Sequence, residues 1–113
     1  MWNCIGKVTV NTAGVPTQVT TTHSRHQSIF FQQMEANTGK IYICSRATAD
    51  KAGSGDNGIL AIIPAPTVAG SYATVLPYAQ VSVPNAPGAL DPFNFWLDVD
   101  VSGDSCQVSA VRP

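Results

Sequence analysis

The residues of this sequence that most resemble a chemical site lie near its carboxyl end, where residues 98–104 begin with the pattern D-x-D-x-S-G. This pattern opens the calcium-binding loop of EF-hand proteins, in which alternate oxygen-bearing side chains ligate the ion and a glycine makes the sharp turn. The twelfth position of such a loop is Ser109 here, where a bidentate glutamate would have to close the site. Because side chains alternate along a strand, we expect Asp98 and Asp100 on a solvated face, with cation binding by Asp98, Asp100 and Asp104 as the alternative.

Histidine and cysteine, the residue types of zinc sites, are present but scattered. Cys4 and Cys44 stand alone, and only His23 and His26 are closely spaced. Structural zinc sites use two such closely spaced pairs. We therefore expect the cysteines to fill small positions in the core and residues 23–26 to form an exposed turn, so the sequence predicts no metal site.

No pattern in the chain is typical of a catalytic centre. There is no G-x-S-x-G turn to expose a nucleophilic serine, and the single glutamate, Glu35, leaves only aspartates to supply a pair of catalytic carboxylates. The glycine-rich residues 53–58 lack the G-K-[ST] ending of a phosphate-binding loop, and no helical pattern follows them. We therefore expect neither enzymatic activity nor a cofactor.

Aromatic side chains offer a different chemistry, because they can stack on sugar rings or anchor a protein partner. Phe95 and Trp96 are neighbours, so in a regular strand one of them faces the core and the other faces outward. The other aromatic candidates for an exposed platform are Trp2, Tyr72, Tyr78 and Phe93.

The elements that position these residues are predicted to be strands, because short runs of Val, Ile, Thr and aromatic residues recur between Gly, Pro, Asn and Asp. Three hairpins are expected, formed by residues 5–10 with 15–22, 27–34 with 40–44, and 93–101 with 105–111. Residues 59–63 are expected as a core strand, residues 45–58 as an exposed loop, and residues 72–83 as a strand broken by Pro77. About eight strands in residues 1–113 predict a single all-β domain, an antiparallel β-sandwich of the jelly-roll or a related Greek-key type.

Charge is sparse and balanced along the chain. Only 12% of the residues are charged, with six Lys and Arg against seven Asp and Glu, whereas about 25% is typical of soluble domains. No segment concentrates either sign, so nucleic acids and anionic membranes are not expected partners.

Sequence features also bear on the compartment. The three cysteines are an odd number and lie far apart, which favours reduced thiols in a cytosol. The first residues lack the pattern of a secretory signal, and the apolar residues 59–63 are too few to span a bilayer. We therefore expect a protein made in the cytoplasm and without a membrane anchor.

The strongest compositional feature is an uncharged, proline-rich stretch. Residues 59–90 contain no Asp, Glu, Lys or Arg, and residues 59–92 hold six of the eight prolines. A flexible linker would be polar, whereas this stretch is stiff and apolar. We expect its proline-rich part, residues 64–92, to be an extended segment that lies against another molecule, because a stiff segment loses less entropy on docking.

Residues 6–10 (GKVTV), 37–43 (NTGKIYI) and 96–104 (WLDVDVSGD) together resemble small β-rich structural proteins of tailed bacteriophages, of the kind that decorate or cement a capsid. The proline-rich residues 59–92 depart from the shorter connection of such proteins. The resemblance implies a virion component that is made in the host cytoplasm, binds the outside of the major capsid protein lattice, and forms a homo-oligomer, either a dimer or a trimer.

These observations lead to one expected function, that of a capsid decoration or cement subunit on the exterior of the virion, which stabilises the lattice of the major capsid protein. The alternatives are a phage tail or head-to-tail connector component and a carbohydrate- or receptor-binding sandwich. The candidate interface residues are Tyr72, Leu76, Tyr78, Val81, Phe93 and Trp96.

Overall fold

The computed structural model describes residues 2–53, 55–66, 77–82 and 88–112. The elements, in chain order, are β1 (Trp2–Thr9), β2 (Thr17–Gln18), β3 (Ser28–Gln33), β4 (Ile41–Cys44), β5 (Ile59–Ile63), β6 (Tyr78–Ser82), the 3-10 turn η1 (Pro92–Asn94), β7 (Trp96–Val99) and β8 (Ser105–Val111). Within the described ranges, no helix has the length and apolar character needed to cross a membrane. The predicted all-β class is confirmed.

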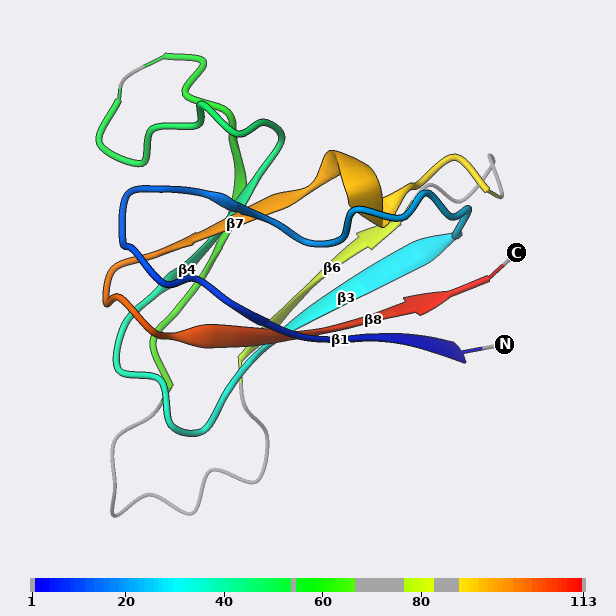
Figure 1. Ribbon diagram of the computed structural model, residues 1–113, viewed down its shortest axis with the longest axis horizontal. Coiled ribbons are helices and arrows are strands. Elements are labelled where there is room, and N and C mark those ends of the chain that lie inside the picture. The colour runs from blue at the N-terminus through cyan, green and yellow to red at the C-terminus, as the bar shows by residue number, and fades with distance from the viewer. Residues whose placement is uncertain (1, 54, 67–76, 83–87, 113) are drawn as a thin grey trace.

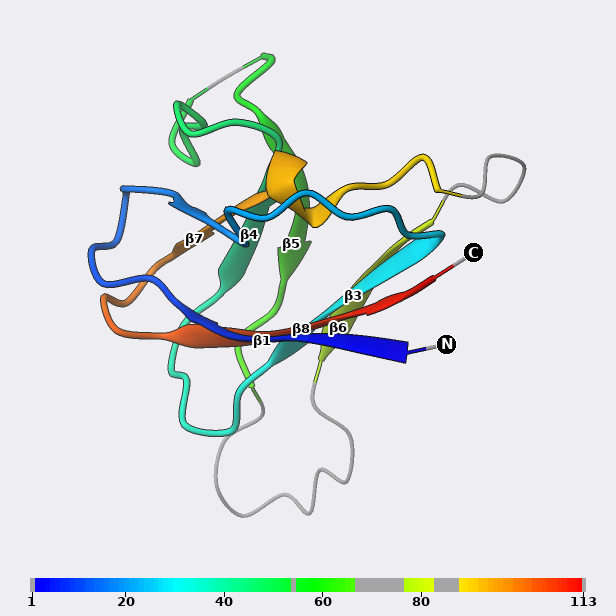
Figure 2. The same ribbon diagram turned by 45° about the vertical axis from the view of Figure 1, so that its right-hand side comes forward.

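The strands form two four-stranded antiparallel sheets, arranged as two layers (Figures 1 and 2). The first sheet has the order β1-β8-β3-β6, and the second sheet has the order β2-β7-β4-β5. Only β4 and β5 are neighbours both in the sequence and within a sheet, so every other connection between successive strands crosses from one sheet to the other. This arrangement confirms the predicted antiparallel sandwich of about eight strands.

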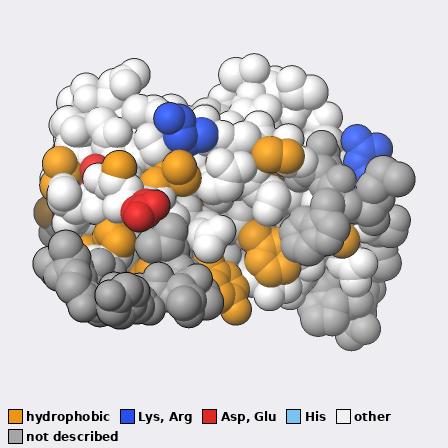
Figure 3. All heavy atoms as spheres, turned by 90° about the horizontal axis from the view of Figure 1, so that it is seen from below, with side chains coloured by type: hydrophobic (Ala, Val, Ile, Leu, Met, Phe, Trp, Pro, Cys, Tyr) orange, Lys and Arg blue, Asp and Glu red, His pale blue; other side chains and the backbone are white. Residues whose placement is uncertain are grey.

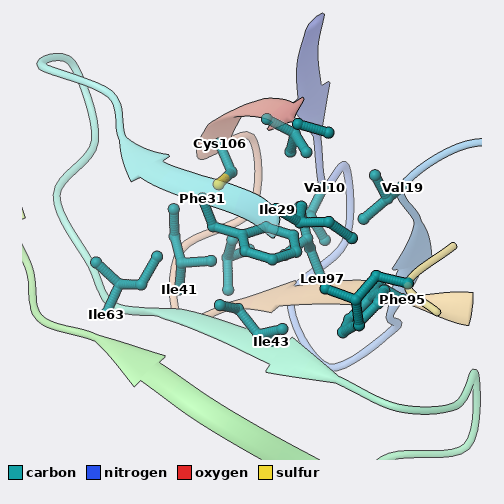
Figure 4. Close-up of a cluster of buried hydrophobic side chains, with 14 residues drawn as sticks. Val10, Val19, Ile29, Phe31, Ile41, Ile43, Ile63, Phe95, Leu97 and Cys106 are labelled. Carbon is teal, nitrogen blue, oxygen red and sulfur yellow. The ribbon is translucent and has the colours of Figure 1, made fainter. Parts of the chain in front are cut away.

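The core lies between the two sheets and follows the alternation of each strand. Ile29 and Phe31 of β3 point inward and are fully buried, as are Ile41 and Ile43 of β4. Figure 4 shows these side chains gathered between the layers, with Phe95 beside them. The ring centroids of Phe31 and Phe95 are 5.8 Å apart, a tilted contact of the kind that aromatic rings favour.

The three predicted hairpins are wrong, because the two strands of each predicted pair belong to opposite sheets. Each turn joins two strands whose apolar faces pack against each other across the core, as Ile29 and Phe31 do with Ile41 and Ile43. A hairpin would instead set those faces side by side in one sheet. Apolar and polar residues alternate in the same way in both arrangements, so the pattern alone does not distinguish them. The strand expected over residues 15–22 is also reduced to Thr17–Gln18.

The uncharged half of the chain enters the sandwich more fully than the sequence suggests. Residues 59–63, predicted as a core strand, form the edge strand β5, and only one side of this strand packs inward. After Pro77 the predicted strand is present as β6, the edge strand of the first sheet. Residues 67–76 and 83–87 lie outside the described part of the chain. Of the extended segment expected over residues 64–92, residues 78–82 belong to the first sheet and Pro92 begins the 3-10 turn.

Residues 93–95 also differ from the expected strand. Pro92–Asn94 make a 3-10 turn, in which the Asp91 side chain caps the start by accepting a hydrogen bond from the Phe93 amide at 3.0 Å. Proline at the first position favours such a turn because it has no N–H to satisfy. The strand β7 then begins only at Trp96.

A buried polar network fixes the turn between β3 and β4 against the start of β8. The Asn37 side chain donates to Gln33 Oε1 at 2.6 Å and to the Ser105 carbonyl, and it accepts from the Ser105 amide at 2.9 Å. Asp104 accepts hydrogen bonds from the Thr38 and Gly39 amides at 3.3 and 3.0 Å. The network satisfies backbone groups that would otherwise be buried without partners, which is why these polar residues are inside.

Candidate functional site

Two edge strands from the uncharged half lie on the same side of the sandwich, and we call them the uncharged edge. β5 ends the second sheet, β6 ends the first sheet, and the two strands contact each other. Ala61 and Ile63 of β5 pack toward the interior and Ile59 is half-buried, while Leu60 and Ile62 point outward and are 55% and 54% exposed. On β6, Tyr78 is 58% exposed. The uncharged edge therefore leaves large apolar side chains in water.

The outer side of the first sheet is nearly free of charge, and we call it the neutral face. Its outward residues follow from the strand registers and are Cys4, Lys7 and Thr9 on β1, Gln107, Ser109 and Val111 on β8, Ser28, Phe30 and Gln32 on β3, and Tyr78, Gln80 and Ser82 on β6. Lys7 is the one charged side chain among these residues. Figure 3 shows a side of the molecule on which charged side chains are few and hydrophobic ones lie scattered among other side chains and backbone.

Neutral polar groups accompany the exposed tyrosine on this face. One register row across the sheet runs from Lys7 through Gln107 and Gln32 to Tyr78. The amide side chains of the row can donate and accept hydrogen bonds, and the tyrosine offers an aromatic ring and a hydroxyl. Such a surface can bind a neutral polar partner without the cost of stripping water from charges.

The aspartates singled out as a possible calcium site use their oxygens inside the protein. Asp98, predicted to be solvated, is only 1% exposed, because residues 11–15 pass over it and its Oδ1 accepts from the amides of Gly14 and Val99, both at 2.8 Å. Asp100 is exposed as predicted, and its carboxylate accepts from the Tyr42 hydroxyl at 3.0 Å and lies 3.4 Å from the Lys51 ammonium. Asp104 is bound to the turn after β3. Three carboxylates with three separate sets of partners do not form one ligand shell.

The histidines and cysteines considered for zinc are also kept apart. Cys4 is exposed on the first sheet, which corrects its expected place in the core, and Cys44 is buried in the second sheet. His26 is fully buried rather than in an exposed turn, and His23 is exposed. In the described part of the chain, no three residues of the types His, Cys, Asp and Glu lie together as a metal site requires.

One close pair was missed by the sequence reasoning. His23 Nδ1 lies 2.6 Å from Asp91 Oδ2, and the imidazole stacks on the Phe93 ring with the centroids 3.8 Å apart. Partial burial alone would raise the pKa of Asp91, but hydrogen bonds from His23 and from the Phe93 and Ser24 amides outweigh it and lower that pKa. No signal in the sequence links residues 23 and 91, because the contact depends on how two loops meet.

A serine lies beside this pair. The Ser24 hydroxyl lies 3.4 Å from His26 Nδ1, and the Ser24 amide donates to Asp91 Oδ1 at 3.2 Å. In these contacts the hydroxyl meets His26 and the carboxylate meets His23, which is not the Ser-His-Asp order of acyl transfer. The pKa of His26 is lowered by burial and by the nearby Arg112 charge, against an opposing effect of Asp91.

The buried thiols are chemically quiet. Burial raises the pKa of Cys44 to about 11 and that of Cys106 to about 12. The thiolate is the reactive form of cysteine, so at neutral pH these two side chains behave as small apolar core residues.

The six predicted interface residues are found in different settings. Tyr78 is exposed on β6, whereas Val81 on the same strand is partly buried and packs against the core. Phe93 is half-buried under His23, and Trp96 is half-buried on β7. Trp96 is the more exposed of the neighbouring aromatics, because Phe95 is a core residue. Tyr72 and Leu76 lie outside the described residues.

The exposed side chains of β5 were missed as interface candidates. Their signal was present in the sequence, since five consecutive apolar residues without a charge are typical of either a central strand or an unguarded edge. The strand was assigned to the core, and Leu60 and Ile62 with it.

Comparison with protein-family models, with curated proteins and with solved structures found no match for this chain.

Proposed function

We propose that the chain is a structural subunit of a virion, of the capsid decoration or cement type, which binds the outer surface of the major capsid protein lattice and stabilises it. The observation that carries the proposal is that two surfaces, the outer side of the first sheet and the edge strand β5 of the second sheet, are exposed and nearly without charge. Tyr78 is exposed on the first and Leu60 and Ile62 on the second, and Lys7 is the one charged side chain among the described outward residues of the neutral face and β5. Depletion of charge with exposed aromatic and aliphatic residues is characteristic of the centre of protein interfaces.

The strand order gives a second line of support. Eight strands ordered β1-β8-β3-β6 over β2-β7-β4-β5 match the pair of Greek keys in a jelly roll, and we propose this fold type for the chain. Jelly rolls occur in viral capsid proteins and in lectins. Since one fold hosts many functions, the strand order supports the proposal only in combination with the surface.

In this proposal the neutral face lies on the capsid and Tyr78 is its anchor. The serine and glutamine side chains of the face pair with backbone and amide groups of the lattice, and the tyrosine ring fills a recess between subunits. A patch of about 800 Å² per partner is the usual size of a specific interface. The subunit cements the lattice when it binds across two capsid proteins. Separating those two proteins then also requires breaking the contact of one of them with the subunit.

A particle-binding experiment tests the proposal. Particles that lack the subunit are mixed with the wild-type chain or with Tyr78→Asp, and the bound chain is measured after sedimentation. We expect at least about tenfold weaker binding for Tyr78→Asp, because a carboxylate would be buried without a partner. Val15→Asp is the matched control, since Val15 is equally exposed at 59% but lies in the loop after β1. Absence of wild-type binding to any site on the particle would contradict the proposal.

The same particles separate a cement subunit from a tail or connector component. A cement subunit is bound in hundreds of copies and raises the temperature at which the capsid releases its genome. A connector component is bound in far fewer copies at one vertex and leaves the temperature of genome release unchanged. Counting bound chains per particle by quantitative mass spectrometry distinguishes the two.

A carbohydrate-binding function is the second candidate, and the row of Gln107, Gln32 and Tyr78 favours it. Sugars are recognised by an aromatic ring that stacks on the pyranose face with amide groups that bind its hydroxyls. A glycan array probed with the wild-type chain and with Tyr78→Ala tests it. Binding that is lost with the tyrosine, together with no binding to capsids, would replace the cement proposal.

A further inference from the structure

We propose that β5 is a self-association site, at which two copies of the chain pair their β5 strands antiparallel across a twofold axis and join their second sheets into one. The inference deepens the proposed function, on which it rests for its biological setting, by naming the residues that would hold copies together on the lattice. The pairing itself is argued from β5 alone.

The first argument is that β5 is an open edge. It pairs with β4 on one side, and none of the described strands pairs with its other side (Figure 2). Near its start, the Ile59 amide is satisfied by the Asn57 side chain at 3.1 Å. Along the rest of the strand, no described strand pairs with the backbone groups that point away from β4, and another extended strand can satisfy them.

The second argument is that the side chains of this edge do not protect it against pairing. Edge strands of monomeric proteins carry lysines, an internal proline, inward-pointing charges or β-bulges, which oppose contact with a second strand. Of these, β5 has only an irregularity at Leu60, where its register with β4 shifts. The sequence of β5 is ILAII, with no charge and no proline before Pro64. Leu60 and Ile62 remain more than half exposed on its outer side.

The third argument is that the strand is complementary to itself. When two copies of β5 pair antiparallel about Ala61, Leu60 of each copy stands opposite Ile62 of the other. The exposed apolar side chains of one copy then meet those of the other on the outer side of the joined sheet. The smallest residue of the strand faces its own copy at the axis, where a larger side chain would meet itself.

Charge and area both favour a second copy as the occupant. Residues 59–90 contain no charged side chain and the whole chain has a net charge of −1, so two copies bring no like charges together at this edge. The twofold axis that pairs β5 also brings the two copies of β6 toward each other, because both edges lie on one side of the sandwich. A five-residue strand alone buries less than the roughly 800 Å² per partner of a standard interface. We therefore expect a weak dimer in solution that is favoured by the high local concentration on a lattice.

The test uses the register, which predicts a specific rescue. Leu60→Lys alone places two lysines opposite apolar Ile62 side chains, and Ile62→Glu alone places two glutamates opposite Leu60. Each variant is expected to dimerise about tenfold to a hundredfold more weakly than wild type in sedimentation equilibrium. Mixing the two variants creates one Lys-Glu pair and keeps one Leu-Ile pair, so heterodimers should form more tightly than either homodimer. Val15→Lys is the control and should dimerise as wild type does.

Three results would overturn the inference. They are a wild-type chain that stays monomeric up to about millimolar concentration, single variants that dimerise as well as wild type, and a mixture that shows no preference for the heterodimer. Thermal unfolding of each variant, monitored by circular dichroism, verifies that the exposed substitutions leave the fold intact. A chain that binds capsids but never pairs through β5 would remove this inference and leave the proposed function, whereas a chain that pairs but binds no capsid would do the reverse.

Discussion

Two regions of this molecule use their side chains in opposite ways. The β3–β4 and β7–β8 turns, together with the strand residues Gln33 and Asp98 beside them, form a region that we call the polar turns. In it, Gln33, Asn37, Asp98 and Asp104 are buried and bind backbone groups. In the uncharged edge, by contrast, Leu60, Ile62 and Tyr78 face water. Polar residues are thus inside one region and apolar residues outside the other, which reverses the usual distribution.

The difference separates residues that hold the fold from residues that are available for a partner. Each polar side chain of the turns satisfies backbone amides or carbonyls, and no buried side-chain nitrogen or oxygen among the described residues lacks a hydrogen-bond partner. Removing one of them leaves several groups unpaired. An exposed apolar side chain has no such partners to lose, so its substitution should affect association and leave folding nearly unchanged.

The largest effect on folding is expected from Asn37→Ala. This substitution leaves Gln33 Oε1 and both the amide and the carbonyl of Ser105 without their partner in the interior. Each unsatisfied buried group costs about 1–3 kcal/mol, so we expect the free energy of unfolding to fall by about 4 kcal/mol. Urea denaturation measures it, and Asn11→Ala, at an exposed position, should change it by less than about 0.5 kcal/mol.

A nearly isosteric variant makes this test stricter. Asn37→Asp keeps the shape but replaces the amide donor by an acceptor, which then faces the oxygens of Gln33 and Ser105. It should destabilise at least as much as Asn37→Ala. Retention of wild-type stability in Asn37→Asp would show that the network is not what fixes this turn.

The polar turns also mark the limit of what the sequence could predict. Alternation on β3, β4 and β8 correctly placed the strands and most of the core, because the inward residues are strongly apolar. Nothing local in the sequence indicated that Asn37 would reach Ser105 or that Gly14 would cover Asp98, since these contacts join residues far apart in the chain. A turn that crosses between sheets and a turn within one sheet have the same local pattern.

A smaller effect is expected at Asp98. Asp98→Ala leaves the amides of Gly14 and Val99 without their acceptor, and we expect a loss of about 2 kcal/mol in the free energy of unfolding. Asp98→Asn keeps an oxygen at the same position and should recover most of that loss. The exposed Asp100→Ala is the control, because only a surface hydrogen bond and a surface ion pair depend on it. Equal losses in Asp98→Ala and Asp100→Ala would contradict the structural role of Asp98.

Acid should weaken the fold through His26, which is fully buried and whose backbone is bridged to Leu90. Its folded-state pKa is lowered below 6.5, chiefly by burial, so between the two values the unfolded chain binds a proton that the folded chain does not. The contribution of His26 is therefore present above pH 6.5 and is lost as the pH falls below it. Urea midpoints measured from pH 8 to pH 5 should fall, and the fall should be smaller in His26→Gln, which retains the exposed His23. An equal fall in both proteins would assign the acid sensitivity to other groups.

The smallest effect on folding is expected at the uncharged edge itself. Leu60→Thr and Ile62→Thr keep a residue that favours strands and remove apolar surface that is already more than half in water. Measured at low protein concentration, each should change the free energy of unfolding by less than about 0.5 kcal/mol, whereas Ile43→Thr, fully buried on the neighbouring strand β4, should cost about 3 kcal/mol. The edge variants should nevertheless dimerise more weakly, because the pair of Leu60 with Ile62 of the second copy loses its contact area. A residue that contributes to association and not to folding is what distinguishes an interaction surface from a core, so large losses of stability in both edge variants would make β5 part of the core.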